Sequence, residues 1–214
     1  MQIRGQLSEA CAALVAVVVG LALVPASHAV EATAPTRVLI VGDSVTQGYR
    51  GDYTWRYFLW RALEARGDAV DFVGRRTGTF YYGADGSYDF DYQGADAYAD
   101  PAFDRDHGAT FGGMLQEGGN WVYDPIGPQV SAHAADVVVS MWGINDLSLA
   151  DVGPADLVAS YRLWVAEARA ANPDVDLVVA RLPYDWMYDE RVRHRARQEA
   201  DERLADHPGD LALP

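Results

Sequence analysis

A serine follows the first strongly apolar segment of the chain. Residues 37–42 read R-V-L-I-V-G, which is typical of a buried strand that ends at a glycine, and D-S-V-T-Q-G comes directly after the strand. The Ser44 hydroxyl would therefore lie at the carboxyl edge of a sheet, where it could act as a nucleophile on a bound substrate. The alternative is an ordinary strand-to-helix turn, in which Asp43 and Ser44 only cap the next helix.

An asparagine ends a later strand in the same way. Residues 136–142 (D-V-V-V-S-M-W) form a β-branched run that suits a strand covered on both faces, and G-I-N-D follows at residues 143–146. The side-chain amide of Asn145 is a suitable donor to an oxyanion. Asparagine at a strand end is more often a turn or cap residue, but two polar motifs at equivalent ends of neighbouring strands together favour a catalytic site.

The segments between these motifs predict how they are positioned. Apolar residues at helical spacing indicate helices over residues 53–65 and from Pro154 to the Asn172-Pro173 pair. Further strands are predicted at residues 69–73 and 175–180, and a weakly amphipathic helix at about 189–205. Strands that alternate with helices predict an α/β fold with a parallel, doubly wound sheet.

The two motifs resemble those of the SGNH hydrolases, also called the GDSL esterase and lipase family. G-D-S-V-T-Q-G is similar to the first block of the family, with Ser44 as the nucleophile, and G-I-N-D to the third, with Asn145 as an oxyanion donor. The resemblance covers about residues 37–183. It implies a flavodoxin-like three-layer α/β/α sandwich.

The second block of the family supplies a glycine whose backbone N–H also binds the oxyanion. Residues 104–114 occupy its place, and Gly112 is the best match. Gly113 is the competing alignment, and a glycine at this position could also serve only in a turn. The resemblance implies that Ser44 attacks an ester carbonyl while the Ser44 N–H, the Gly112 N–H and Asn145 hold the developing charge. The motif is not the G-x-S-x-G turn of the α/β-hydrolases, which disfavours that fold.

The histidine that should activate the serine is the missing part of this pattern. The family has a D-x-x-H block after its last strand, but in this chain Leu204 stands where the aspartate that precedes His207 by three residues should be. The literal D-x-x-H at residues 104–107 places His107 before the Asn145 strand. Both histidines are candidate bases, whereas His207 could simply end a helix and His107 could line the site or order the neighbouring loop.

Two further histidines fit the role less well. His133 precedes the Asn145 strand at its amino end, and His194 lies among arginines of the predicted helix 189–205. We therefore expect a shortened family member that lacks the last strand, the histidine block and the closing helix. Such a chain would expose a sheet edge, and we expect it to lack ordinary ester turnover.

A long acidic and aromatic segment lies between the two motifs. Residues 77–108 contain seven aspartates and eight tyrosines or phenylalanines. The favoured interpretation is a solvated acidic loop held by its aromatic residues. A sugar-stacking surface and a calcium-binding loop are the alternatives, although no aspartate spacing follows an EF-hand pattern.

The first 29 residues are typical of a secretory signal peptide. Arg4 provides the charged start, residues 11–24 form the apolar core, and Ser27-His28-Ala29 offers small residues at the -3 and -1 positions of a cleavage site; an uncleaved membrane anchor is the alternative. Cleavage would leave a hydrolase domain at residues 30–214 without the single cysteine and hence without disulfides. The sequence predicts a secreted or extracytoplasmic protein with no stable membrane span.

Composition limits the partners. The formal net charge is -14, and all 17 basic residues are arginines, so the composition argues against nucleic acid as a partner. No cysteine or histidine cluster has ligand spacing and no phosphate-binding loop follows a strand, so no metal, nucleotide or flavin cofactor is expected. The sequence leaves the oligomeric state open.

These observations predict an exported serine ester hydrolase for short acyl esters, with acetylated carbohydrate as a candidate substrate. Two alternatives stay open at this point. The first is a non-catalytic exported carbohydrate-binding protein derived from the same fold. The second is an acyltransferase, which would pass the same acyl-serine intermediate to a sugar hydroxyl in place of water.

Overall fold

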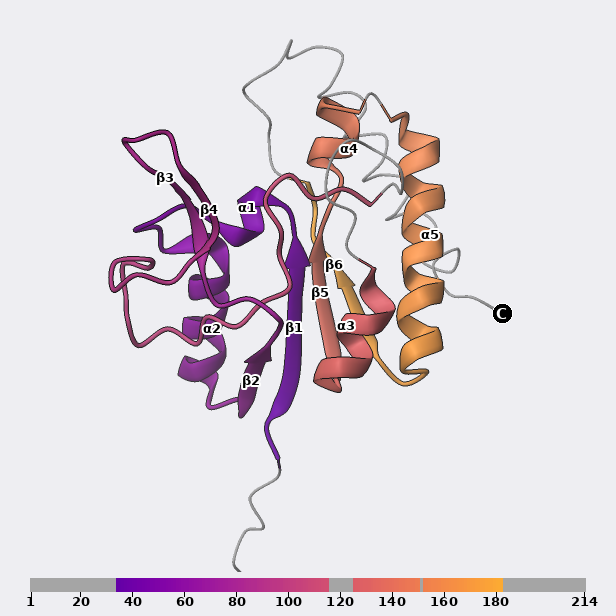
Figure 1. Ribbon diagram of the computed structural model, residues 1–214. Coiled ribbons are helices and arrows are strands. Elements are labelled where there is room, and N and C mark those ends of the chain that lie inside the picture. The colour runs from indigo at the N-terminus through magenta and orange to yellow at the C-terminus, as the bar shows by residue number, and fades with distance from the viewer. Residues whose placement is uncertain (1–33, 116–124, 151, 183–214) are drawn as a thin grey trace, which may run out of the picture. The chain divides into compact units, whose positions relative to one another are not determined.

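A parallel sheet lies at the centre of the computed structural model, which describes residues 34–115, 125–150 and 152–182. All described residues belong to the unit that begins at Ala34. Within them the sheet has the order β2-β1-β5-β6, formed by β1 (Thr36–Gly42), β2 (Val70–Val73), β5 (Val137–Met141) and β6 (Asp176–Val179) (Figure 1). Each neighbouring pair is parallel, as the sequence predicted.

Helices cover both faces of this sheet. Helix α2 (Thr54–Arg66) lies on one side, and α3 (Ile126–His133) and α5 (Pro154–Ala171) lie on the other (Figure 1). Two short helices, α1 (Ser44–Gln47) and α4 (Ile144–Ser148), follow β1 and β5 directly. The described residues therefore form the three-layer α/β/α sandwich that the sequence predicted.

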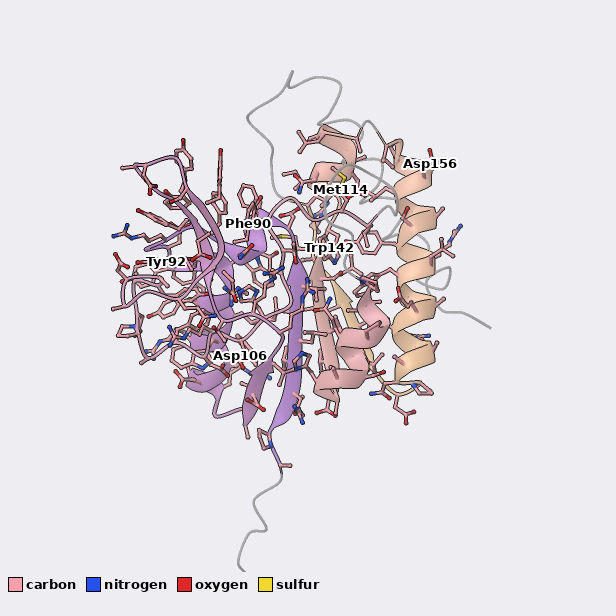
Figure 2. All side chains as sticks on the ribbon, in the orientation of Figure 1. Phe90, Tyr92, Asp106, Met114, Trp142 and Asp156 are labelled. Atoms are coloured by element: carbon pink, nitrogen blue, oxygen red, sulfur yellow. The ribbon has the colours of Figure 1, made fainter. Side chains whose placement is uncertain are left out.

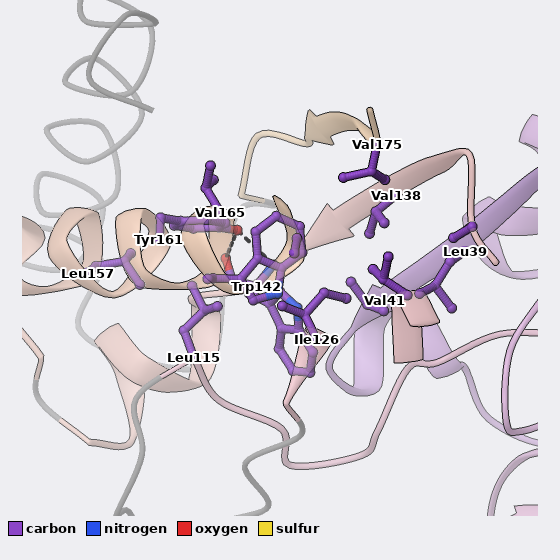
Figure 3. Packing of buried hydrophobic residues seen from close by; sticks show 14 of the residues in the cluster. Leu39, Val41, Leu115, Ile126, Val138, Trp142, Leu157, Tyr161, Val165 and Val175 are labelled. Atoms are coloured by element: carbon purple, nitrogen blue, oxygen red, sulfur yellow. Dashed lines mark hydrogen bonds between the residues drawn. The ribbon is translucent and has the colours of Figure 1, made fainter. Parts of the chain in front are cut away.

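The side chains of β1 point alternately to the two faces of the sheet, and both faces are covered. Val38 and Ile40 pack with Phe72 of β2 and with the apolar side of α2, whereas Leu39 and Val41 pack against α3 and α5. In the core between the sheet and helices α3 and α5, the Tyr161 hydroxyl of α5 donates to the Trp142 carbonyl at 3.0 Å and accepts from the Trp142 N–H at 3.1 Å (Figure 3). This contact fixes α5 to the end of β5.

The segment 77–108 is more ordered than the sequence indicated. It contains an antiparallel hairpin of β3 (Thr79–Tyr82) and β4 (Tyr88–Tyr92), so its description as a loop was wrong for these residues. Its aromatic residues do hold the segment in place, because Tyr98 and Phe103 are buried against the α2 layer. Strand signals were present in the aromatic run T-F-Y-Y of β3 and in the alternating Y-D-F-D-Y of β4, but the many aspartates of the segment favoured a loop.

Two other differences concern helices. The sequence did not predict α3, whose eight residues include a glycine and a proline near the start. The predicted helix 189–205 and the expected loss of the last strand lie outside the described residues. In the described part of the chain, no helix has the length and apolar character needed to cross a membrane.

Candidate active site

The turn after β1 places Ser44 at the start of α1. Gly42 has a φ of +156°, and a Cβ on it would lie 2.2 Å from Thr46 Oγ1, so only glycine fits there. The buried Asp43 carboxylate accepts a hydrogen bond from the Val45 N–H at 2.9 Å and caps the helix. Within the described residues, neither the N–H nor the hydroxyl of the half-buried Ser44 has a hydrogen-bond partner.

A second buried carboxylate lies near this turn. Asp146 of α4 is fully buried and accepts the Leu115 N–H with both oxygens, at 3.1 and 3.3 Å. Burial raises the pKa of Asp43 from 3.8 to about 7, and the charge of Asp146 contributes to this rise, while the Val45 N–H opposes it. The Asp43 side chain beside Ser44 is therefore mostly neutral below about pH 7.

The Gly112 segment reaches the same edge of the sheet. The N–H groups of Gly108 and Thr110 donate to the carbonyls of Ile40 and Gly42, both at 2.8 Å, so this segment runs beside β1 beyond the end of β2. Gly112 then has a φ of +72° in a tight turn, closed by the Gly113 N–H, which donates to Thr110 O at 2.9 Å. The turn thus uses the Gly113 N–H, whereas the Gly112 N–H has no partner among the described residues.

Asn145 faces this turn from α4. Its Nδ2 donates to the Gly113 carbonyl at 2.9 Å. Because an amide nitrogen carries two N–H groups, this bond orients the side chain and leaves the second N–H for another acceptor. Gly42 pairs with Met141 in the register of β1 and β5, so the motifs that contain Ser44 and Asn145 follow neighbouring strands at the same edge.

Gln47 is a site residue that sequence reasoning missed. Its buried side chain accepts the Phe111 N–H at 2.6 Å and donates to the Phe90 carbonyl at 2.5 Å. It therefore joins the serine helix α1 to the Gly112 turn and to strand β4. Its place in the G-D-S-V-T-Q-G motif was the available signal, but both partners are far away in sequence.

Arg56 is a second residue that was missed. Its fully buried guanidinium donates to the Thr46 and Gln47 carbonyls, at 2.9 and 3.2 Å, and so binds the last carbonyls of α1. It also donates to Arg105 O at 3.1 Å and to the Tyr98 hydroxyl at 2.8 Å. These contacts fix the helix that begins with Ser44.

The structure does not support His107 as the base. The fully buried ring makes a 2.9 Å hydrogen bond through Nε2 to Gly78 O, and its Nδ1 accepts the Ala109 N–H at 3.0 Å. Asp104, its partner in the D-x-x-H spacing, accepts the Phe72 N–H at 2.8 Å instead. Because burial also lowers the pKa of His107 well below its ordinary value, this residue orders the segment before Gly112 as a neutral ring.

The other histidines do not complete the described site either. His133 lies in the last turn of α3, which leads into the amino end of β5, away from the edge with Ser44. His194 and His207 lie outside the described residues. Over the ranges that the structure describes, no group of three His, Cys, Asp or Glu side chains could hold a metal ion.

The fold places the chain among α/β/α proteins with polar motifs at the carboxyl edge of a parallel sheet. Its sequence matches the GDSL-like lipase/acylhydrolase family over residues 40–212, and the chain therefore belongs to this family. No curated protein matches the chain.

Solved structures share the fold. A carbohydrate esterase family 3 protein from Talaromyces cellulolyticus is 24% identical with a TM-score of 0.57, and an acetyl esterase mutant with acetate ion is 22% identical with a TM-score of 0.59; each match covers 82% of this chain and 72% of that chain. A family 3 carbohydrate esterase from Clostridium thermocellum is 23% identical with a TM-score of 0.55, over 82% of this chain and 70% of the other.

Proposed function

We propose that the chain is an exported serine ester hydrolase that acts on short acyl esters of carbohydrates through an acyl-Ser44 intermediate. Membership of the acylhydrolase family supports ester hydrolysis. The observation that carries the proposal is the set of hydrogen bonds by which the Gly112 turn is held to Gly42 on one side and to Asn145 on the other. The carbohydrate part is supported by the esterases that share the fold.

In the proposed reaction the Ser44 oxygen attacks the ester carbonyl and a histidine takes its proton. The negative charge on the carbonyl oxygen is held by the N–H groups of Ser44 and Gly112 and by the second N–H of Asn145. Each well-placed donor contributes roughly 3 kcal/mol to stabilisation of the transition state. The intermediate expels the alcohol, which receives the proton from the histidine, and water then hydrolyses the acyl-serine.

We propose His207 as the general base. The family match extends to residue 212 and includes this histidine, whereas both ring nitrogens of His107 are already hydrogen bonded. His194 also lies in the matched region and provides a control, because the sequence places it among arginines on a predicted helix. This assignment replaces the sequence-based preference for a chain without a base.

The test measures acetate release from p-nitrophenyl acetate and from an acetylated xylo-oligosaccharide. We expect turnover that Ser44→Ala and His207→Ala each reduce by at least about 10³-fold, with His194→Ala close to the unmodified chain. A fluorophosphonate should label Ser44. Absence of both turnover and labelling would contradict the hydrolase assignment, and full turnover by His207→Ala would reject only that base.

A further inference from the structure

The two faces of the β3–β4 hairpin differ in what covers them. On one face, Tyr81 and Tyr92 pack with ring centroids 4.9 Å apart, and the Arg50 guanidinium lies 4.9 Å from the Tyr81 centroid. Arg50 pairs with Asp96, which also accepts the Tyr92 hydroxyl at 2.7 Å. The aromatic and charged side chains on this face therefore already have partners within the chain.

The opposite face presents aromatic rings to solvent. We call it the aromatic platform; it consists of Phe80 at its centre with Tyr49, Tyr82, Tyr88, Phe90 and Phe111 around it. Phe80 is buried and stacks on Phe111 at 3.9 Å, whereas Tyr88 and Phe90 are 62% and 50% exposed. Large aromatic side chains gathered on one exposed surface are typical of a binding site.

The platform is continuous with the candidate active site. Phe111 directly precedes Gly112, and Gln47 of the serine helix contacts the main chain of both Phe111 and Phe90. The Phe80 N–H also donates to Gly48 O at 2.9 Å, just after that helix. Figure 2 shows Phe90 on the α1 side of the hairpin. The rings therefore adjoin the segments that carry Ser44 and Gly112.

The charge and the exposure of the residues around the platform indicate which class of ligand it can bind. Exposed Asp85 lies in the turn of the same hairpin, whereas Asp89 pairs with Tyr81 and lies on the other face. The chain also carries a formal charge of -14, which disfavours anionic ligands such as phosphates or uronates. A neutral pyranose fits, because its C–H face packs on an aromatic ring while its hydroxyls bind tyrosine hydroxyls. The Tyr82 and Tyr88 hydroxyls have no partner among the described residues. A long acyl chain would gain little from rings that stay half exposed to water.

We propose that the aromatic platform is a subsite that binds a neutral sugar ring of the ester substrate beside Ser44. This inference rests on the proposed function, because it assigns the alcohol side of the same ester. It makes the hairpin the part of the molecule that distinguishes a glycan ester from a simple ester of the same acid.

The test compares two acetate esters in the variants Tyr88→Ala and Phe90→Ala. We expect the ratio of kcat/KM for an acetylated xylo-oligosaccharide to that for p-nitrophenyl acetate to fall at least tenfold. Phe58→Ala is the control, because Phe58 is 63% exposed on α2 and should leave this ratio unchanged. An unchanged ratio in both platform variants, or a selective loss of activity on p-nitrophenyl octanoate, would overturn the proposal.

A binding measurement separates this proposal from the proposed function. Calorimetry with the deacetylated xylo-oligosaccharide and Ser44→Ala should show binding that Tyr88→Ala weakens at least tenfold. Such binding in a chain without esterase turnover would support the platform and contradict only the hydrolase, leaving a glycan-binding protein. Equal affinity with and without the Tyr88 ring would overturn the platform even if esterase activity is present.

Discussion

Asp43 shows how strongly position determines the chemistry of a single carboxyl group. It precedes the candidate nucleophile, is almost completely buried, and lies within the influence of the Asp146 charge. In the proposed reaction, a neutral Asp43 would avoid a negative charge close to the oxyanion that forms at Ser44. The protonation state of Asp43 therefore affects both the charge next to Ser44 and the free energy of unfolding.

Replacing Asp43 by asparagine should make stability less dependent on pH. The folded chain holds this proton up to about pH 7, whereas the unfolded chain releases it near pH 3.8, so stability falls as the pH rises between these values. The loss amounts to at most about 4 kcal/mol. Urea unfolding at several pH values should show a flatter profile for Asp43→Asn, which keeps the helix cap, while the exposed control Asp156→Asn keeps the original slope. Identical profiles for Asp43→Asn and the unmodified chain would contradict the raised pKa.

Replacing Asn145 by alanine separates an oxyanion donor from a purely structural amide. We expect kcat to fall about 10²- to 10³-fold with little change in KM, since the donor acts mainly in the transition state. Asn172→Ala is the matched control, because Asn172 also donates from Nδ2 to a main-chain carbonyl, that of Ala135, at 3.0 Å. Both variants should lose about 1 kcal/mol of stability. If both also showed the same kcat, Asn145 would have no role in the chemistry.

At the scale of elements, a short helix depends on a side chain from a longer one. Helix α1 has only four residues and makes few hydrogen bonds of its own, but Arg56 of α2 binds the carbonyls at its end. The position of Ser44 is thus set by contacts between α1, α2 and the segment that contains Tyr98 and Arg105.

Arg56→Met should destabilise the chain and lower the reactivity of Ser44. Loss of the charged donors leaves main-chain carbonyls without partners, and we expect a decrease of about 3 kcal/mol or more in the free energy of unfolding. Arg61→Met, which removes an exposed pair with Glu64, should cost less than about 1 kcal/mol. The rate of fluorophosphonate labelling, measured well below the unfolding midpoint, should fall in Arg56→Met only. Equal labelling rates in both variants would limit Arg56 to a role in stability.

The sequence allowed the elements with strong apolar patterns to be predicted. Strands β1, β2, β5 and β6 and helices α2 and α5 lie within a few residues of their predicted bounds because burial on a sheet face imposes a simple pattern. The roles of Gln47 and Arg56 could not be predicted, since they depend on partners that only folding brings near. The same reason explains His107: the spacing to Asp104 suggested a catalytic pair, but the two side chains bind different main-chain groups.

At the scale of the whole molecule, export should determine where the mature chain begins. Expression of the full sequence in a secreting bacterial host should yield a protein that starts at Val30, because Ser27 and Ala29 place small residues at the -3 and -1 positions after an apolar core. Intact mass and amino-terminal sequencing of the secreted product check this. Recovery of the chain in the membrane fraction with residues 1–29 attached would contradict cleavage and favour the anchor.

The side chain of Gln47 couples the motion of the β3–β4 hairpin to that of the loop before Gly112. Its amide group binds strand β4 through its nitrogen and the loop before Gly112 through its oxygen, so outward motion of the hairpin would strain or break a hydrogen bond next to the proposed oxyanion donor. A ligand that restrains the hairpin would therefore also restrain the loop before Gly112. Local opening of β4, followed by hydrogen exchange, would then rise and fall together with the reactivity of the serine.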